Sequence, residues 1–188
     1  VPIELLANIE LPAEAAQARE AGASGVGLFR TEFLFMNRRE LPGEDEQYEA
    51  YREAVLGMGG GPVTIRTIDI GADKPLEGMT PSELRQESVL NPALGLRAIR
   101  WSLSEPSMFR QQLRAIYRAS AFGKVRLLIP MVAHLSEVRQ IIETVKKRHP
   151  TARINGLSIE PYLARPNGRE LMIGVSRDPI FGPIITFG

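Results

Sequence analysis

The sequence predicts an α/β protein in which parallel strands are followed by a short antiparallel β segment. Apolar, β-branched runs alternate with helical stretches through residues 1–140. Two of these runs end in the same Arg-Thr pair, at Arg30 and at Arg66. The alternation then stops, and the runs 154–162, 170–176 and 180–187 are rich in strand-forming residues with turn residues between them. We therefore divide the chain into 1–140 and 141–188.

The elements of the first part follow from local signals. Pro12 suits the start of a helix, and Gly22 suits its end. The acidic residues Glu44 to Glu46 favour the first turn of a later helix, where they complement its dipole. Ser136 is a suitable N-cap for the last helix. In chain order, we predict strands at 4–9, 26–29, 63–68 and 125–132, and helices at 12–21, 43–56, 92–103, 106–121 and 137–147.

Composition excludes several classes of function. Of the 188 residues, 44% are hydrophobic and 24% charged, which is typical of a soluble globular protein. The net charge of +1 gives no reason to expect nucleic acid as a partner. There is no cysteine, so disulfides, thiolate zinc sites and a thiol nucleophile are excluded, and His134 and His149 lack the spacing of metal ligands. No apolar run has the length of a membrane span, so we expect a cytoplasmic protein.

The repeated strand-Arg-Thr pattern is the main functional signal. Arg30 and Arg66 are separated by about the length of one strand–helix–strand unit. Two guanidinium groups at the same ends of neighbouring parallel strands would form one site for a phosphate or a carboxylate. A lone arginine at a strand end is more often a surface ion-pair partner, and the repetition argues against that reading here. Residues expected to support the two arginines are Thr31, Glu32, Thr67, Asp69 and Lys74.

Several motifs resemble one known family. They are Gly27 to Met36, Leu41-Pro42 with Glu44 to Tyr48, Ile65 to Lys74, Asn91 to Arg100, and Gln111 to Ile116 with Arg118 to Lys124. Together they resemble the barrel of enzyme I that binds phosphoenolpyruvate (PEP). Enzyme I is the PEP–protein phosphotransferase of the bacterial sugar phosphotransferase system.

The resemblance implies a (β/α)8 barrel that binds PEP and Mg²⁺ at the C-terminal face of its strands. It implies that Arg30 and Arg66 hold the phosphate and that Arg97 lies near the same pocket. The chemistry implied is phosphoryl transfer to a protein histidine, with a phosphocarrier protein as partner. The family's acidic metal ligands, third substrate arginine and cysteine acid belong to the second half of the barrel. We therefore expect an incomplete catalytic set and an inactive chain.

About four of the eight barrel strands are expected in this chain, so it is a partial TIM barrel with two open sheet edges. Such edges predict a possible homodimer. Residues from about 150 to 188 resemble an ATP-grasp segment of ADP-forming acyl-CoA synthetases. Two alternatives to the PEP function therefore stay open at this stage: a fragment of an ATP-grasp acyltransferase, and a non-catalytic half-barrel module.

Overall fold

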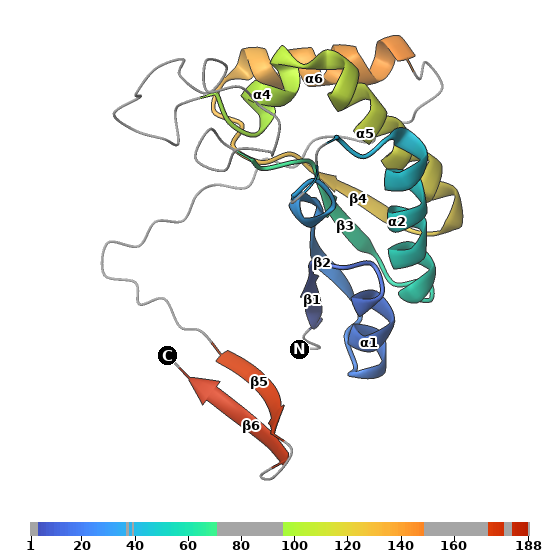
Figure 1. Ribbon diagram of the computed structural model, residues 1–188, viewed down its shortest axis with the longest axis vertical. Helices are drawn as coiled ribbons and strands as arrows, with labels where there is room; N and C mark the ends of the chain where they lie inside the picture. Colours follow the sequence, from blue (N-terminus) through green and yellow to red (C-terminus); the bar gives the residue numbers. More distant parts are fainter. Residues whose placement is uncertain are drawn as a thin grey trace. The chain divides into compact units, whose positions relative to one another are not determined.

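Four parallel strands form one sheet in the order β1-β2-β3-β4 (Figure 1). The computed structural model describes residues 4–36, 38, 40–70, 96–148, 173–178 and 182–187. The chain divides into two compact units, Val1–Ala152 and Arg153–Gly188. The strands of the first unit are β1 (Leu6–Ile9), β2 (Gly25–Arg30), β3 (Val63–Arg66) and β4 (Val125–Leu128). Its helices are α1 (Glu14–Glu20), η1 (Thr31–Leu34), α2 (Glu44–Gly57), α4 (Ile99–Ser104), α5 (Pro106–Ala119), η3 (Ser120–Phe122) and α6 (Leu135–Arg148).

This arrangement confirms the predicted α/β class. Every neighbouring pair of strands in the sheet is parallel. Parallel strands need a crossover connection, and α1 and α2 provide the first two. Within the described residues, β1 and β4 are the edge strands of this sheet.

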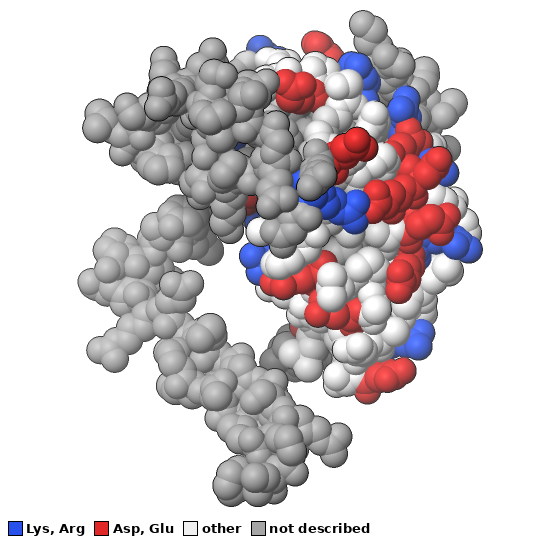
Figure 2. Space-filling view, viewed as in Figure 1, with Lys and Arg blue, Asp and Glu red and all other residues white. Residues whose placement is uncertain are grey.

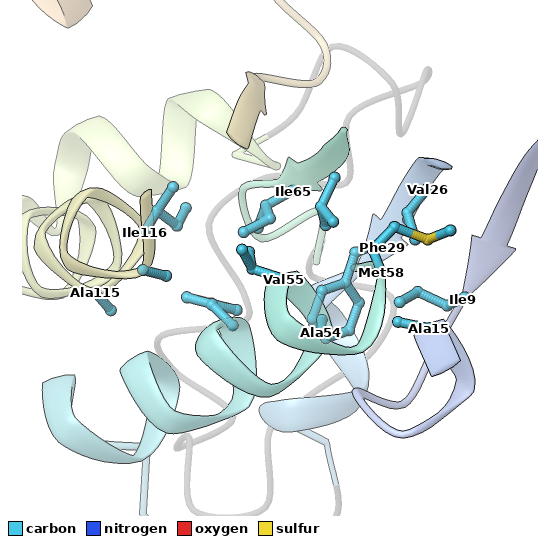
Figure 3. Close-up of a cluster of buried hydrophobic side chains, with 13 residues drawn as sticks. Ile9, Ala15, Val26, Phe29, Ala54, Val55, Met58, Ile65, Ala115 and Ile116 are labelled. Atoms are coloured by element: carbon cyan, nitrogen blue, oxygen red, sulfur yellow. The ribbon is translucent and has the colours of Figure 1, made fainter. Parts of the chain in front are cut away.

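The main core lies between one face of the sheet and helices α1, α2 and α5 (Figure 3). Alternate side chains of a strand point to opposite faces, so Val63 and Ile65 of β3 face this core together. Tyr51 of α2 meets Phe29 of β2 edge to face, with ring centroids 6.0 Å apart. The buried members are Ile9, Ala15, Val26, Phe29, Tyr51, Ala54, Val55, Met58, Val63, Ile65, Ala115, Ile116 and Ala119.

A second cluster supports the segments that follow β2 and β3. Phe35 lies just after η1, while Ile68 and Ile70 follow β3. These side chains pack with Trp101 of α4 and Met108 of α5. Apolar packing therefore holds the carboxyl ends of both strands.

Ion pairs connect α2 with α5 at the surface. Glu44 Oε2 accepts a hydrogen bond from Arg114 Nε at 2.6 Å, and Asp45 Oδ1 accepts one from Arg118 Nη1 at 2.7 Å. Arg118 also lies over the ring of Tyr48, 4.0 Å from its centroid. Figure 2 shows that acidic side chains have basic neighbours on this face of the first unit.

Two helices use a glutamate of their first turn to bind preceding backbone amides. Glu14 Oε2 accepts from the N–H groups of Glu10 and Leu11, and Glu137 Oε2 accepts from those of Ala133 and His134. Burial alone would raise the pKa of Glu137, but these amides outweigh it, so the pKa lies below its ordinary value. Ser136 lies inside α6, so its assignment as the N-cap was wrong.

The segments around the predicted site differ from the sequence-based expectation. Thr31 and Glu32 begin the 3₁₀ helix η1 directly after β2, an element that is not predicted from the sequence. Arg97 lies in the turn before α4, and not on the helix predicted for residues 92–103. Residues 71–95, which include Lys74, lie outside the described residues.

In the second unit, β5 (Ile173–Asp178) and β6 (Gly182–Phe187) pair antiparallel, with Val175 opposite Ile185. The predicted run at 154–162 lies outside the described residues. Among the helices that the structure describes, none is long and apolar enough to cross a membrane.

We predict that Gly25→Ala destabilises the first unit. A Cβ at Gly25 would lie 2.6 Å from the backbone oxygen of Pro62, which already accepts the N–H of Val26. Overpacking against backbone costs about 1–3 kcal/mol of unfolding free energy. Urea denaturation measures the loss. The matched control is Gly43→Ala, where nothing lies within 4 Å of the added Cβ and we expect a change below about 1 kcal/mol. Equal losses in the two variants would contradict the prediction.

We also predict an alkaline loss of stability that depends on Tyr51. Burial raises the pKa of its phenol above the ordinary value, although hydrogen bonds with Gln112 and Thr31 act in the opposite direction. Below pH ~10 the phenol is protonated in both states, and its contribution to stability is complete. Above that pH the unfolded chain loses the proton and the folded chain keeps it, so the unfolding free energy falls by about 1.4 kcal/mol per pH unit.

The comparison variant is Tyr51→Phe, which lacks the titrating group. Urea unfolding from pH 8 to pH 11 should show the wild type losing its advantage over Tyr51→Phe only at the alkaline end. Parallel stability curves over this range would contradict the assignment.

Candidate functional site

Arg30 and Arg66 lie opposite each other at the carboxyl ends of β2 and β3. The two residues are partners in the parallel register, directly after the pair Phe29 and Ile65. Phe29 and Ile65 face the helices, so strand alternation directs both arginines to the other face of the sheet. The convergence predicted from the repeated Arg-Thr pattern is therefore present in the backbone register.

Arg30 is held by a carboxylate from the neighbouring strand. Its Nη1 donates to Glu10 Oε1 at 2.6 Å, and both side chains are about two-fifths exposed. Glu10 directly follows β1, and its own backbone N–H is bound by Glu14. The guanidinium also lies 5.3 Å from the ring centroid of Phe33. These contacts give Arg30 a defined position while leaving part of it accessible.

Arg66 is more buried and has two carboxylate partners. Its Nη2 donates to Glu32, whose side chain is only 9% exposed, and its Nη1 lies 3.3 Å from Asp69 Oδ2. Asp69 Oδ1 also accepts a hydrogen bond of 3.2 Å from Arg97 Nε. One carboxylate therefore links the second and third arginines. We call the six side chains the strand-end charge cluster: Glu10, Arg30, Glu32, Arg66, Asp69 and Arg97.

The turn that carries Arg97 has an unusual backbone. Ala98 adopts a φ of +50°, in the left-handed region that favours glycine. Its N–H donates to the carbonyl of Ile70 at 3.2 Å, directly after the segment that holds Asp69. This contact holds the turn beside that segment, and it accounts for the approach of Arg97 to Asp69.

Hydrogen-bonding capacity is left over in the cluster. Arg66 Nε, Thr67 Oγ1 and Glu32 Oε2 are buried and have no hydrogen-bond partner among the described residues. Buried polar atoms are normally paired, because an unpaired one loses its interaction with water. Two of the three are donors or can donate, so a polar ligand with acceptor oxygens fits this part of the chain.

A buried polar network lies between the charge cluster and the helices. Gln112 of α5 donates through Nε2 to Thr31 Oγ1 at 3.3 Å and to the Tyr51 hydroxyl at 3.2 Å. Its Oε1 accepts the backbone N–H of Ile68 at 3.1 Å. Thr31 Oγ1 in turn donates to the carbonyl of Arg66 at 2.8 Å. The Tyr51 hydroxyl donates to Gln47 Oε1 at 3.1 Å. We call the set Thr31, Gln47, Tyr51 and Gln112 the Gln112 network.

The structure brings most of the predicted site residues together. Arg66 and Arg97 join Glu32 and Asp69 in one chain of ion pairs. Arg30, which is opposite Arg66 in the strand register, pairs separately with Glu10. Thr31 is a member of the Gln112 network. The hydroxyl of Thr67 is buried and has no hydrogen-bond partner among the described residues, and Lys74 lies outside them.

Sequence reasoning missed Glu10 and Gln112. Glu10 follows the first strand just as Arg30 follows the second, so its position at the same sheet edge was a usable signal. Gln112 interrupts the apolar stripe formed by Phe109, Ala115, Ile116 and Ala119 on α5. A polar residue within an apolar helical stripe signals a buried hydrogen-bonded group.

The described residues do not form a divalent-metal site. They contain no group of three histidine, aspartate or glutamate side chains arranged to hold a metal ion. All three carboxylates of the charge cluster, Glu10, Glu32 and Asp69, are bonded to arginine. Mg²⁺ is bound mainly through free carboxylates and phosphate oxygens, so these residues do not fit that role.

Comparison with known proteins gives consistent matches. Residues 1–164 match the family described as PEP-utilising enzyme, PEP-binding domain. A phosphoenolpyruvate-protein phosphotransferase of Cupriavidus necator is 62% identical over 95% of this chain and 30% of its own length. One from Staphylococcus aureus is 49% identical over 74% of this chain and 24% of its own length. A multiphosphoryl transfer protein of Rhodobacter capsulatus is 48% identical over 84% and 19%, respectively.

These matches also bear on the end of the chain. The family match continues past residue 140, and the C. necator match covers nearly the whole sequence. Neither gives support to the ATP-grasp resemblance of the last residues, and the division at residue 140 stays a prediction. The chain spans less than a third of the length of each of these relatives. The family match covers most of the chain, and a relative is 62% identical over 95% of it, so this chain belongs to the family of PEP-utilising enzymes, PEP-binding domain.

Proposed function

We propose that this chain binds the phosphate group of PEP between Arg30 and Arg66, as part of a phosphotransferase that passes the phosphoryl group to a protein histidine. The observation that carries the proposal is the register of β2 and β3, which makes the two arginines neighbours at the carboxyl ends of parallel strands. Binding sites of open or closed parallel sheets lie at this end of the strands. The names of the relatives, which include PEP-protein phosphotransferase, support the same reading.

Fixed guanidinium groups suit phosphoryl transfer. The transferred group carries negative charge on its equatorial oxygens, and preorganised donors stabilise it without rearranging during the reaction. Arginine provides planar, paired donors that match a phosphate better than the single ammonium group of lysine. The carboxylates Glu10, Glu32 and Asp69 keep the arginines in place before the ligand arrives.

The same carboxylates limit the affinity. Each arginine already has an ionic partner, so the phosphate must share or replace Glu10 at Arg30 and must tolerate Glu32 and Asp69 near Arg66. A charge-assisted hydrogen bond contributes about 1.5–3 kcal/mol when well formed, and part of this is lost to ordering. We therefore expect a dissociation constant of roughly 1 mM for the isolated chain.

The wider assembly is part of the same proposal. The four strands would be half of a (β/α)8 barrel comprising residues 1–140, with residues 141–188 as a separate β-rich segment. A second half of the barrel, or a second copy of this chain, would cover the edges β1 and β4. Mg²⁺, the accepting histidine and a phosphocarrier protein belong to the complete cytoplasmic enzyme in this proposal. The isolated chain would bind PEP and transfer nothing.

Titration by NMR tests the binding site. Inorganic phosphate and PEP should shift the signals of Arg30 and Arg66 in the wild type, and Arg30→Ala should weaken binding by about tenfold or more because one charge-assisted contact is lost. Arg52→Ala on α2, which breaks an exposed pair with Glu49, is the charge-matched control and should bind as the wild type does. No shift at either arginine at high ligand concentration would reject the proposed function.

Arg66 needs a different design. Arg66→Ala would leave the buried Glu32 without its cation and would destabilise the fold for that reason alone. The double variant Arg66→Ala with Glu32→Gln removes both charges and keeps the pair balanced. We expect it to stay folded by circular dichroism and to lose phosphate binding, and unchanged binding would contradict the role of Arg66.

Glu10 gives a prediction in the opposite direction. Glu10→Gln removes the carboxylate that competes with the ligand for Arg30, so phosphate and PEP should bind about two to five times more tightly, in keeping with the value of a half-exposed ion pair. The control is Glu20→Gln, which changes the net charge equally. Glu20 is the last residue of α1, whereas Glu10 lies before that helix begins. The competition is disproved if Glu10→Gln binds no better than Glu20→Gln.

A further inference from the structure

We infer that Gln112 is a positioning residue that sets the relation between the two arginine-bearing strand ends, an inference that rests on the proposed anion site. Gln112 belongs to α5, far from β2 and β3 in the sequence, and its side chain is fully buried. Its amide contacts the segment after β2 through Thr31 and the segment after β3 through Ile68. Arg30 directly precedes Thr31, and Asp69 directly follows Ile68.

The directions of these hydrogen bonds are determined by one backbone group. The N–H of Ile68 can only donate, so it must meet the Oε1 of Gln112. The NH₂ group of Gln112 then donates to the hydroxyls of Thr31 and Tyr51. Those hydroxyls must pass their own protons on, from Thr31 to the carbonyl of Arg66 and from Tyr51 to Gln47. Each amide and hydroxyl of the Gln112 network therefore has one orientation that is compatible with all of these hydrogen bonds.

This chain of donors ties both strand ends to each other. Thr31, at the end of β2, bonds the carbonyl of Arg66 at the end of β3, and Gln112 bonds Thr31 and the amide two residues after Arg66. A shift of one strand end along its axis would break bonds at both ends of the amide. The Gln112 network therefore holds the backbones from which the two guanidinium groups project.

The residue type at this position is restricted by chemistry. The amide of glutamine has an acceptor and two donors on one planar group, and the site uses all three functions. Glutamate would lack the donors, and methionine, which has a similar length, would lack both. Glutamate could still accept the N–H of Ile68 but could not donate to the hydroxyls of Thr31 and Tyr51. Methionine would leave both the N–H of Ile68 and the hydroxyl of Thr31 buried without this partner.

A purely structural role would produce a different result from a positioning role, and the test is designed to separate them. The first readout is the set of Nε–Hε NMR signals of Arg30 and Arg66 in the free chain. The second is titration of the 188-residue chain with inorganic phosphate and with PEP. Gln112→Met should shift the Arg66 and Arg30 signals and weaken binding of both ligands about five- to tenfold.

The matched control is Val55→Ala. Val55 is buried in the core on α2, and its side chain approaches Gly123, which precedes β4, at the end of the sheet opposite the arginines. Val55→Ala should lower the unfolding free energy measurably while leaving the arginine signals and the phosphate affinity as in the wild type. Thr31→Val serves as a second variant if Gln112→Met does not fold, because it removes the hydroxyl that links Gln112 to the carbonyl of Arg66.

The effects of Gln112→Met and Thr31→Val on phosphate binding should not be additive. If Gln112 acts on Arg66 through Thr31, the double variant should bind phosphate about as weakly as the weaker single variant. Arginine signals and affinity that stay unchanged in Gln112→Met, despite a loss of stability, would overturn the inference while leaving the proposed function intact. A wild-type chain that binds neither ligand would reject the proposed function, and the arginine signals of the free chain would still decide whether Gln112 positions the strand ends.

Discussion

The parallel pairing of β2 with β3 is the constraint on which the candidate site depends. This pairing places Arg30 opposite Arg66 and, one position earlier, Phe29 opposite Ile65. The apolar pair is buried against α2 and α5, so the register cannot slip by one residue without exposing it and burying the arginines instead. Core packing and the geometry of the charged site are therefore consequences of a single register.

The positive charges of the three arginines in the strand-end charge cluster are compensated by three carboxylates of the same cluster. Glu10, Glu32 and Asp69 come from the segments after β1, β2 and β3, respectively, so each strand end contributes one acid. The pairing keeps buried Arg66 from remaining an isolated charge, which would be costly. In the proposed binding of phosphate, an anion would therefore have to exchange with Glu10 at Arg30.

The Gln112 network shows how helices can hold a site that they do not form. Tyr51 of α2 and Gln112 of α5 belong to the apolar faces of their helices, yet Gln112 bonds polar groups at the strand ends and Tyr51 accepts a hydrogen bond from Gln112. The raised pKa of Tyr51 follows chiefly from its burial in this network. Removing any single member leaves at least one buried polar group of the others without its partner, so the network favours one arrangement of the two strand ends.

Local pattern was enough to predict the alternation of strands and helices, the α/β class and the two arginines at strand ends, because each depends on short-range periodicity. The exact boundaries of the helices were less predictable, as Ser136 inside α6 and Arg97 before α4 show. Only the tertiary structure decided which carboxylate pairs with Arg30 and which helix residue contacts the strand ends. Glu10 and Gln112 lie 20 and 82 positions from Arg30 in the chain, and contacts over such separations depend on strand order and helix packing. Sequence thus determined which side chains stand at the strand ends, and the sheet decided which of them meet.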